Sequence, residues 1–426
     1  MSNIQPHVAE KSATYEVLKE LEQSAPWPRV PLTEAVDLNP KPERGSLSDD
    51  LQVSFVPMAA VEAGTGAIDT SAVRKYSEVK KGYTYFREGD VLFAKITPCM
   101  ENGKMAVAHG LRNGIGFGST EFHVLRPHEG VDAHFVYHFV SSVRFRAEAA
   151  HHMTGAVGQK RVPAAFLEQS EIPLPPINEQ RRIVAEIEKQ FSRLDEAATN
   201  LKRVQAGLKN YKAMVTEEIV GSATAREMAI ADIVSEDFKT GLSIKKTESG
   251  GIPSLKLSAL RDGRIDFKQS KMLPVRIEDV RQILLRPGDF LVTRGNGSIK
   301  LVGGGALVEA VPGAVIFPDL LIRLRVRADT IEPRWLNLVW RTRSVRKQIE
   351  QKAKTTAGIY KISQRDLRSI KLSVPSLSEQ RRIAKEVERR LAEVGNLEAQ
   401  LSQELTRAAR LRESILSHAF STTRPT

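Results

Sequence analysis

Two segments of the sequence gather side chains that can hydrogen-bond to a polyanion. Each runs from a glycine-aspartate pair through an apolar stretch into polar and basic residues: "GDVLFAKITPCMENGK" at 89–104 and "GDFLVTRGNGSIK" at 288–300. Lysine and arginine donate to phosphate oxygens or guanine edges, and asparagine suits the edge of adenine. We therefore select as candidate nucleic-acid contacts Lys95, Thr97, Asn102, Lys104, Arg294, Asn296, Ser298 and Lys300. The competing interpretation is that both segments are turns with solvated charges.

A second pair of segments lies further along the chain. These are "TGAVGQKRV" at 154–162 and "TTAGIYKIS" at 355–363, each a glycine-containing turn that precedes a long proline-free stretch. Their polar side chains are suited to contacts with phosphates, namely Lys160, Arg161, Tyr360 and Lys361. An equal alternative is that each turn packs its domain against the following helix.

Motifs for catalysis or metal binding are missing from the sequence. "GNGSIKLVGGG" at 295–305 lacks the Gly-Lys-Ser/Thr end of a P-loop, and "LPPI" at 174–177 is not the Asp/Asn-Pro-Pro-aromatic tetrapeptide of amino-methyltransferases. His151 and His152 are adjacent, which is not a metal-ligand spacing, and Cys99 is the single cysteine. We therefore expect no catalytic residue, no bound metal and no cofactor on this chain.

One pattern occurs twice in the chain. "INEQRRIVAEIEKQF" starts at 177 and "LSEQRRIAKEVERRL" starts at 377, and similarity between the two halves extends through most of the sequence. The shared motif consists of Glu179, Gln180, Arg181, Arg182, Ile183, Glu379, Gln380, Arg381, Arg382 and Ile383. Because both halves carry it, we interpret it as packing between helices or against a partner protein rather than as reading of a sequence.

Each half has the same plan of elements. Short apolar runs separated by turn signals such as "REGD" and "RPGD" predict a mixed α/β domain, and a proline then precedes a long helix. Asn178 and Ser378 are the expected N-caps. The expected division is an N-terminal helical extension at 1–25, a first domain at 26–176, a central helix at 177–222, a second domain at 223–376, a C-terminal helix at 377–420 and a tail at 421–426.

The long segments have heptad patterning, which is typical of coiled coils. In the first, apolar residues recur every seven positions at Ile187, Leu194, Leu201, Leu208 and Val215, with Ile183, Ala197, Val204 and Tyr211 between them. The second series is Val387, Val394, Leu401, Ala408 and Ile415, with Ile383, Leu397 and Leu411 between them. We expect an α+β protein whose two mixed α/β domains, in a pseudo-two-fold arrangement, are separated by a long antiparallel coiled coil. The alternative is that each helix packs only on its own domain.

Charge and composition narrow the class of partner. The 426 residues carry a net charge of +12 and have a pI near 9.6, which favours a polyanionic partner. No apolar run approaches the ~18 residues that span a bilayer, and the polar N-terminus does not look like a signal peptide. We expect a soluble, cytoplasmic protein.

The paired "PxxxEQRRI" segments at 175–183 and 375–383, with the segments at 89–104 and 288–296, resemble the specificity subunit of type I restriction-modification systems. The resemblance covers nearly the whole chain, but the second half departs from the family pattern after Arg294. It implies two target recognition domains that bind double-stranded DNA, two modification methyltransferase subunits as partners, and restriction subunits in the full complex. S-adenosylmethionine, ATP and Mg²⁺ would belong to those partner subunits.

We therefore expect a non-catalytic subunit that recognises a bipartite asymmetric duplex site, the helices setting the gap between its parts. One rival is a coiled-coil adaptor that binds DNA without sequence preference, and its affinity would be wholly salt-driven. Another is a self-contained restriction-modification enzyme, against which the missing cofactor motifs count.

Overall fold

The computed structural model describes residues 27–42, 47–156, 158–244, 251–261, 263–356 and 358–420. The expected N-terminal extension at 1–25 and the tail at 421–426 lie outside these residues. The chain divides into two compact units. Unit 1 comprises Met1–Lys202 and Ser402–Thr426, and unit 2 comprises Arg203–Leu401.

Unit 1 is built around an antiparallel four-stranded sheet with the order β2-β9-β6-β7. Its strands are β2 (Val36–Leu38), β6 (Val91–Ala94), β7 (Met105–Val107) and β9 (Phe122–Pro127). A second sheet, β4-β3-β8-β5, contains β3 (Gln52–Val56), β4 (Val73–Lys75), β5 (Thr84–Arg87) and β8 (Ile115–Gly118). The ribbon β1 (Arg29–Pro31) with β10 (Glu171–Pro173) leads into the first long helix.

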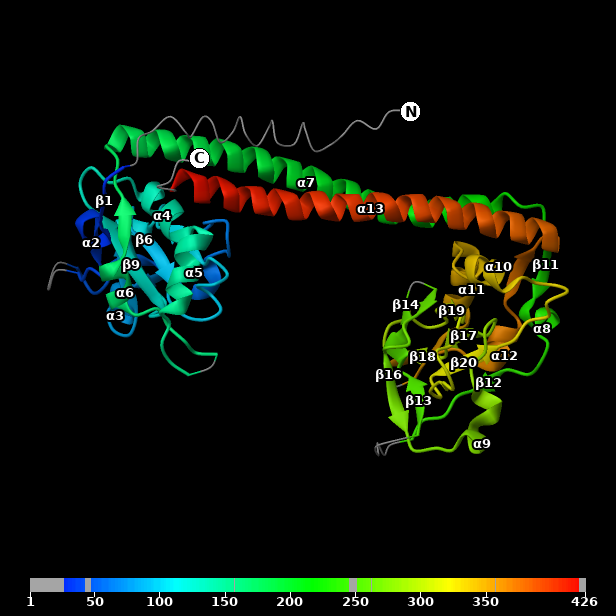
Figure 1. Ribbon diagram of the computed structural model, residues 1–426. Coiled ribbons are helices and arrows are strands. Elements are labelled where there is room, and N and C mark those ends of the chain that lie inside the picture. The colour runs from blue at the N-terminus through cyan, green and yellow to red at the C-terminus, as the bar shows by residue number, and fades with distance from the viewer. Residues whose placement is uncertain are drawn as a thin grey trace, which may run out of the picture. The chain divides into compact units, whose positions relative to one another are not determined.

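Helices cover the first sheet of unit 1 (Figure 1). Asp132 caps α4 (Ala133–Ser141) by accepting from the amides of His134 and Phe135, and Ser142 caps α5 (Val143–His151). The shorter helices are α2 (Leu32–Ala35), α3 (Tyr76–Val79), α6 (Ala164–Gln169), η1 (Met58–Ala60) and η2 (Arg112–Gly114). The buried faces of α4 and α5 form one core with β6 and with both long helices.

Unit 2 repeats the central sheet of unit 1 with the order β12-β20-β17-β19. Its strands are β12 (Lys239–Thr240), β17 (Phe290–Thr293), β19 (Gly305–Leu307) and β20 (Leu321–Leu324). The smaller sheets comprise β11 (Arg226–Ala229), β13 (Ile252–Leu255), β14 (Leu260–Arg261), β15 (Arg264–Ile265), β16 (Ser270–Leu273), β18 (Gly295–Asn296), β21 (Lys354–Thr356), β22 (Ile359–Lys361) and β23 (Lys371–Val374). The helices are α8 (Ile230–Ile233), α9 (Ile277–Val280), α10 (Pro333–Val339), α11 (Arg343–Lys352), α12 (Gln364–Arg368), η3 (Leu257–Ala259) and η4 (Arg281–Ile283).

The glycine-aspartate pair that the two halves share has the same function in both units. In unit 1 the Asp90 carboxylate accepts from the backbone amide of Arg87 at 2.7 Å, which closes the turn before β6. It also binds the guanidinium of Arg126 on β9 through two hydrogen bonds of 2.8 and 2.7 Å. The aspartate therefore ties a turn to the neighbouring strand.

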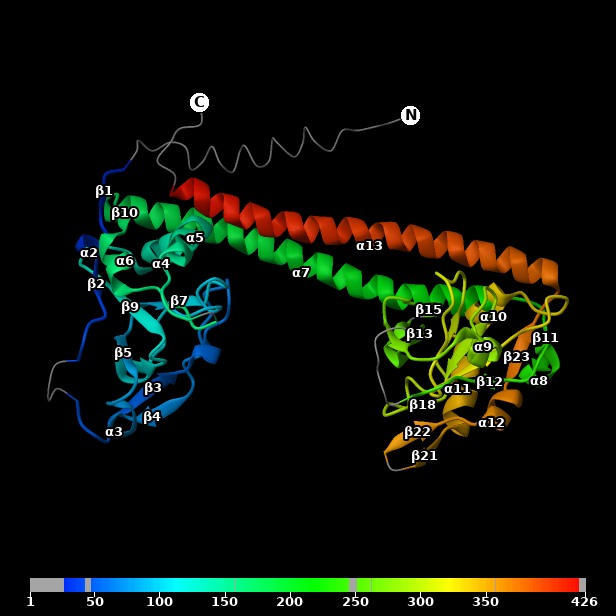
Figure 2. The ribbon, with the colours of Figure 1, turned by 60° about the horizontal axis from the view of Figure 1, so that its bottom comes forward.

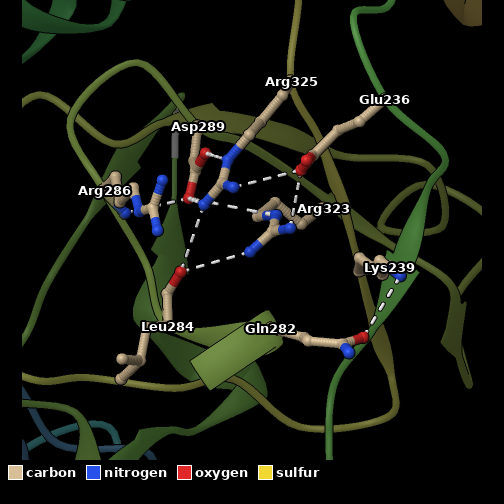
Figure 3. Close-up of polar contacts among 8 residues, drawn as sticks. All are labelled: Glu236, Lys239, Gln282, Leu284, Arg286, Asp289, Arg323 and Arg325. Atoms are coloured by element: carbon tan, nitrogen blue, oxygen red, sulfur yellow. Dashed lines mark hydrogen bonds and ion pairs between the residues drawn. The ribbon is translucent and has the colours of Figure 1, made fainter. Parts of the chain in front are cut away.

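In unit 2 the equivalent aspartate, Asp289, lies in a larger buried network (Figure 3). Its carboxylate accepts from the amide of Arg286 at 2.9 Å and from Arg325 Nε at 2.5 Å. A second guanidinium, that of Arg323, is 2% exposed and bonds to Glu236 at 2.8 Å. Burial lowers the pKa of Arg323, and the neighbouring carboxylates oppose that shift.

Two long helices, α7 (Ile177–Gly221) and α13 (Leu377–Ala419), each contribute to both units. In unit 1 the start of α7 packs with the end of α13, and Arg412 pairs with Asp195 at 2.7 Å. In unit 2 the end of α7 packs with the start of α13, and Lys212 pairs with Glu398 at 2.5 Å. The helices are therefore antiparallel within each unit. Two mixed α/β units with two long helices confirm the predicted fold class.

The heptad assignment needs one correction. The rows spaced by seven from Ile187 and Val387 face inward, but Val204 and Leu397, placed between them, are about half exposed, and Ala197 and Tyr211 are also exposed. The inward residues of the intervening row on α7 lie one position later, at Phe191, Ala198, Gln205 and Lys212. Two of these four residues, Gln205 and Lys212, are polar, so hydropathy alone does not locate the row.

The expected N-caps are also wrong. Helix α7 begins at Ile177, and the carbonyl of Pro176 accepts from the amides of residues 179 and 180. Helix α13 begins at Leu377, where Ser376 Oγ accepts from the amide of Glu379 at 3.3 Å. Helix α7 thus starts directly after Pro176 and helix α13 directly after Ser376, one residue before the expected caps Asn178 and Ser378. No helix among the described residues is long and apolar enough to cross a bilayer.

Candidate nucleic-acid interface

In unit 1 the two candidate segments lie side by side. The loop that follows β6 is joined to the 154–162 hairpin because the amide of Val162 donates to Lys95 O at 2.9 Å and that of Thr97 donates to Lys160 O at 3.0 Å. The hairpin itself is closed by reciprocal bonds between Thr154 and Arg161, of 3.0 and 2.8 Å. Segments far apart in sequence therefore form one surface.

Unit 2 makes the same connection with more regular strands. The amide of Ile362 donates to Arg294 O at 2.9 Å, and β18 pairs with β22, which pairs in turn with β21. This hairpin lies on the side of unit 2 away from α13 (Figure 2). In both units a loop after the central strand thus joins a hairpin that precedes a long helix.

The two loops share a turn and differ in their side chains. Gly103 and Gly303 each have a φ of +69°, a conformation that favours glycine, and each stands two residues before the next sheet strand. In unit 1, Lys104 follows the glycine, whereas Gly304 follows it in unit 2. The backbone frame is repeated while the side chains on it have diverged.

Lys104 is the candidate whose placement differs most from expectation. Its ammonium is directed inward and donates to the carbonyls of Met58 and Val61, at 3.0 and 2.9 Å. The structure therefore gives this lysine a role in bracing η1, and we leave it out of the candidate surface.

Where Lys104 lies in unit 1, unit 2 has a cavity of about 770 Å³ beside its loop. Gly304 supplies no side chain to fill the cavity, and its lining includes Asn296, Lys300, Trp340 and Arg346. The side-chain surface beside the loop therefore differs between the units.

The other unit 1 candidates divide into paired and exposed residues. Arg161 binds Glu121 through bonds of 2.8 and 2.9 Å, and this guanidinium lowers the pKa of the Glu121 carboxyl. Burial lowers the pKa of Lys95, which is half-buried. Asn102 and Lys160 are exposed, and no hydrogen bond or ion pair of either side chain is found within the described part of the chain.

The unit 2 candidates present more exposed cations. Arg294, Lys300 and Lys361 are exposed. Asn296 is partly buried, and its Oδ1 accepts from the amide of Ser298 at 3.0 Å, so it stabilises the loop. Tyr360 packs at the edge of the core. Exposed positive charge therefore comes from both the loop and the hairpin.

The repeated helix motif is explained by a buried glutamine. Gln180 is 1% exposed, donates to Pro175 O at 2.8 Å and accepts from the amide of Asp132 at 2.8 Å. Gln380 is fully buried and makes the same two contacts, with the carbonyl of Pro375 and the amide of Glu332, both at 2.8 Å. Each glutamine joins the start of a long helix to the start of α4 or α10.

The remaining motif residues have simpler surroundings. Ile183 and Ile383 are buried in the cores of units 1 and 2. Arg182 and Arg382 pair with Glu179 and Glu379, respectively, each at 2.6 Å. Arg181 and Arg381 are exposed, and Arg381 approaches Glu332 at 3.5 Å.

Sequence reasoning missed two arginines beside the candidate loops. Arg146 of α5 donates to the carbonyl of Glu101, and Arg346 of α11 donates to the carbonyls of Val302 and Ile299. Extending the repeat back from the long helices would have paired these two positions. Among the described residues, no group of three or more His, Cys, Asp or Glu side chains could hold a metal ion.

Comparisons with known proteins agree with this architecture. Residues 26–205 match the family described as the type I restriction modification DNA specificity domain. The chain is 41% identical over 172 residues to the Escherichia coli type I restriction enzyme EcoAI specificity subunit, a match that covers 40% of the chain and 29% of that protein. It is 29% identical over 312 residues to the EcoKI specificity subunit of Escherichia coli strain K12, covering 70% and 67% of the two chains.

A solved chain from a type I R-M system superposes with a TM-score of 0.72 at 22% identity, covering 93% of this chain and 98% of that one. Fold and site together define a two-domain protein with one loop-and-hairpin surface in each domain. Residues 26–205 therefore carry a type I restriction modification DNA specificity domain, and the chain is similar to type I restriction enzyme specificity subunits over as much as 70% of its length.

Proposed function

We propose that this chain is the DNA sequence-specificity subunit of a type I restriction-modification enzyme, and that each unit recognises one part of a bipartite, asymmetric duplex site. The observation that carries the proposal is the repeated loop-and-hairpin surface. Its backbone connections are the same in both units, yet its side chains differ, as two readers of different sequences require. The net charge of +12 suits a duplex partner.

Two modification methyltransferase subunits, and restriction subunits in the full complex, are the proposed protein partners. The exposed arginines of the repeated motif, Arg181 and Arg381, are candidates for that contact because they occur in both units. The chain itself would contribute no catalytic group. S-adenosylmethionine, ATP and Mg²⁺ would act in the partner subunits.

The test is to map N6-methyladenine by single-molecule sequencing in cells that co-express this chain and its neighbouring methyltransferase. Methylation confined to one split motif, and lost without this chain, would support the proposal. Methylation that persists unchanged without the chain would contradict a specificity role and favour the adaptor.

Removing one exposed cation should weaken DNA binding without altering preference. Lys361→Ala removes a hairpin charge from unit 2, so affinity should fall alike for cognate and unrelated duplexes. The slope of log Kobs against log salt should become shallower by about 0.9. Fluorescence anisotropy at several salt concentrations measures both quantities.

Lys385→Ala is the matched control, because Lys385 is an exposed lysine on α13 of the same unit. We expect its slope to stay closer to that of the unmodified protein. Equal effects of the two substitutions would place the hairpin outside the DNA-binding surface.

A further inference from the structure

Arg146 connects helix α5 to the unit 1 loop. Its side chain is partly buried, and Nε donates at 3.0 Å to the carbonyl of Ser141, the last residue of α4. Nη1 donates to the carbonyl of Glu101, which lies between the candidate contacts Thr97 and Asn102. The guanidinium thus joins a rigid helix to the middle of the loop.

Arg346 makes the equivalent connection in unit 2. Nη1 donates to Val302 O at 2.7 Å and Nη2 to Ile299 O at 3.0 Å. The two terminal nitrogens of the guanidinium, its fork, therefore hold the loop on both sides of Lys300. Its Nε pairs with Glu350 on the same helix at 2.9 Å, which fixes the orientation of the fork.

The two arginines occupy equivalent positions. Each lies four residues after the N-cap of its helix and donates its amide to that cap carbonyl, that of Ser142 at 3.0 Å and that of Thr342 at 2.9 Å. The helix faces also match, because Phe145 and Val345, just before the arginines, are both buried. The two arginines therefore make the same connection between helix and loop in both units, although the two loops differ in sequence.

The hydrogen-bond acceptors explain how the same arginine contact can hold two loops of different sequence. Both arginines bind backbone carbonyl oxygens of the loop, and every residue has a carbonyl. Side chains of the loop are left free to change without losing the anchor. A charged donor also makes a stronger hydrogen bond than a neutral one.

We propose that Arg146 and Arg346 are positioning residues for DNA recognition: each holds the backbone of its loop in the conformation that presents the loop side chains to one part of the site. The effect on DNA recognition rests on the proposed function, whereas the anchoring of the loop by the arginine does not. The two parts can be tested separately.

Hydrogen exchange without DNA tests the loop-holding. In unit 1 the amides of Met100 and Asn102 donate within the loop, to Ile96 O and Pro98 O, both at 3.0 Å. Arg146→Ala should speed their exchange by about 10- to 100-fold, as expected when a charged hydrogen bond that limits local opening is lost. The amide of Gly303, which donates to Thr293 O in unit 2, should keep its rate, and Arg346→Ala should give the reverse pattern.

Matched controls separate position from charge. Arg144 on α5 and Lys347 on α11 are exposed, and Arg144→Ala and Lys347→Ala remove the same charge without a loop contact. Arg146→Lys retains the charge but not the forked donor, so its effect should lie between those of alanine and the unmodified protein. Unchanged exchange in Arg146→Ala and Arg346→Ala would overturn the proposal.

Methylation mapping tests the consequence. Arg146→Ala should relax the base requirement in one part of the split motif and leave the other part intact, while Arg346→Ala should relax the other part. A merely structural role would lower total methylation without relaxing either part, and that result would overturn the positioning role. If the unmodified chain directs no defined motif, the proposed function fails, whereas the exchange rates still decide the loop-holding.

Discussion

Replacing Asp289 by alanine should lower the free energy of unfolding of unit 2 by about 3–5 kcal/mol, because the guanidinium groups of Arg323 and Arg325 would then share the single carboxylate of Glu236 in a buried network. Asp289 is 1% exposed, and its carboxylate faces two arginines: Arg325 Nε at 2.5 Å and Arg323 Nε at 4.0 Å (Figure 3). The turn before β17 would also lose the acceptor for the amide of Arg286.

The measurement is denaturant unfolding followed by tryptophan fluorescence. Two of the three tryptophans, Trp335 and Trp340, are buried in the core of unit 2, so the signal reports mainly on this unit. Asp289→Asn keeps an acceptor and removes the charge, and its loss should be smaller than that of alanine.

Asp279→Ala is the control for loss of a carboxylate in the same unit. Asp279 pairs with Arg276 on the surface, with side chains 54% and 81% exposed, and such pairs contribute at most about 1 kcal/mol. If Asp289→Ala shifts the unfolding transition no further than Asp279→Ala does, the network of Figure 3 contributes little to stability.

The parts of the fold that the sequence predicts are those set by patterns of neighbouring residues in the chain. The repeat indicated two similar units, and heptad spacing identified the inward rows that contain Ile187 and Val387. The same spacing predicts intervening rows that contain Ala197, Val204 and Leu397, but the inward positions are offset by one residue. In a 3.5-residue repeat the step from one inward row to the other is either three or four residues. Which of the two occurs depends on the helix or domain that packs against this face.

The joining of loop and hairpin was beyond sequence reasoning. Residues 95 and 162 are linked by a backbone hydrogen bond, and backbone groups carry no sequence signature. The same limit applies to Lys104, since a lysine in a basic loop looks like a DNA contact until its ammonium is found on two internal carbonyls. Arg146 and Arg346 were missed because their acceptors are carbonyls rather than recognisable side chains.

Replacing His138 by leucine should stabilise unit 1 by about 1–3 kcal/mol at pH 7, the cost of a buried polar group without partners. His138 is 4% exposed, and neither ring nitrogen finds a hydrogen-bond partner in the part of the chain that the structure describes. It packs against Tyr137 and Phe191. Unit 2 has Leu338 at the corresponding position of α10, so leucine suits this place in the fold.

The same substitution should flatten the dependence of stability on pH. Burial, with smaller contributions from His134 and Arg412, lowers the pKa of His138 from 6.5 to about 3. Between these values the unfolded chain binds a proton that the folded chain does not, so stability falls as the pH falls below about 6.5. The loss is ~1.4 kcal/mol per pH unit, or about 2 kcal/mol at pH 5, and His138→Leu should lack it.

The measurement is denaturant unfolding of the unmodified protein and of His138→Leu, followed by far-UV circular dichroism at pH 7, 6 and 5. It gives the difference in their free energies of unfolding at each pH. Burial also lowers the pKa of His123, and the Asp37 carboxylate raises that of His128, but both groups are present in both proteins and cancel in the comparison. His134→Leu on the same helix is the control, because His134 is exposed and its loss should change stability by less than about 0.5 kcal/mol. Parallel pH profiles for His138→Leu and the unmodified protein would mean that the buried imidazole gains a partner, or protonates readily, in the folded state.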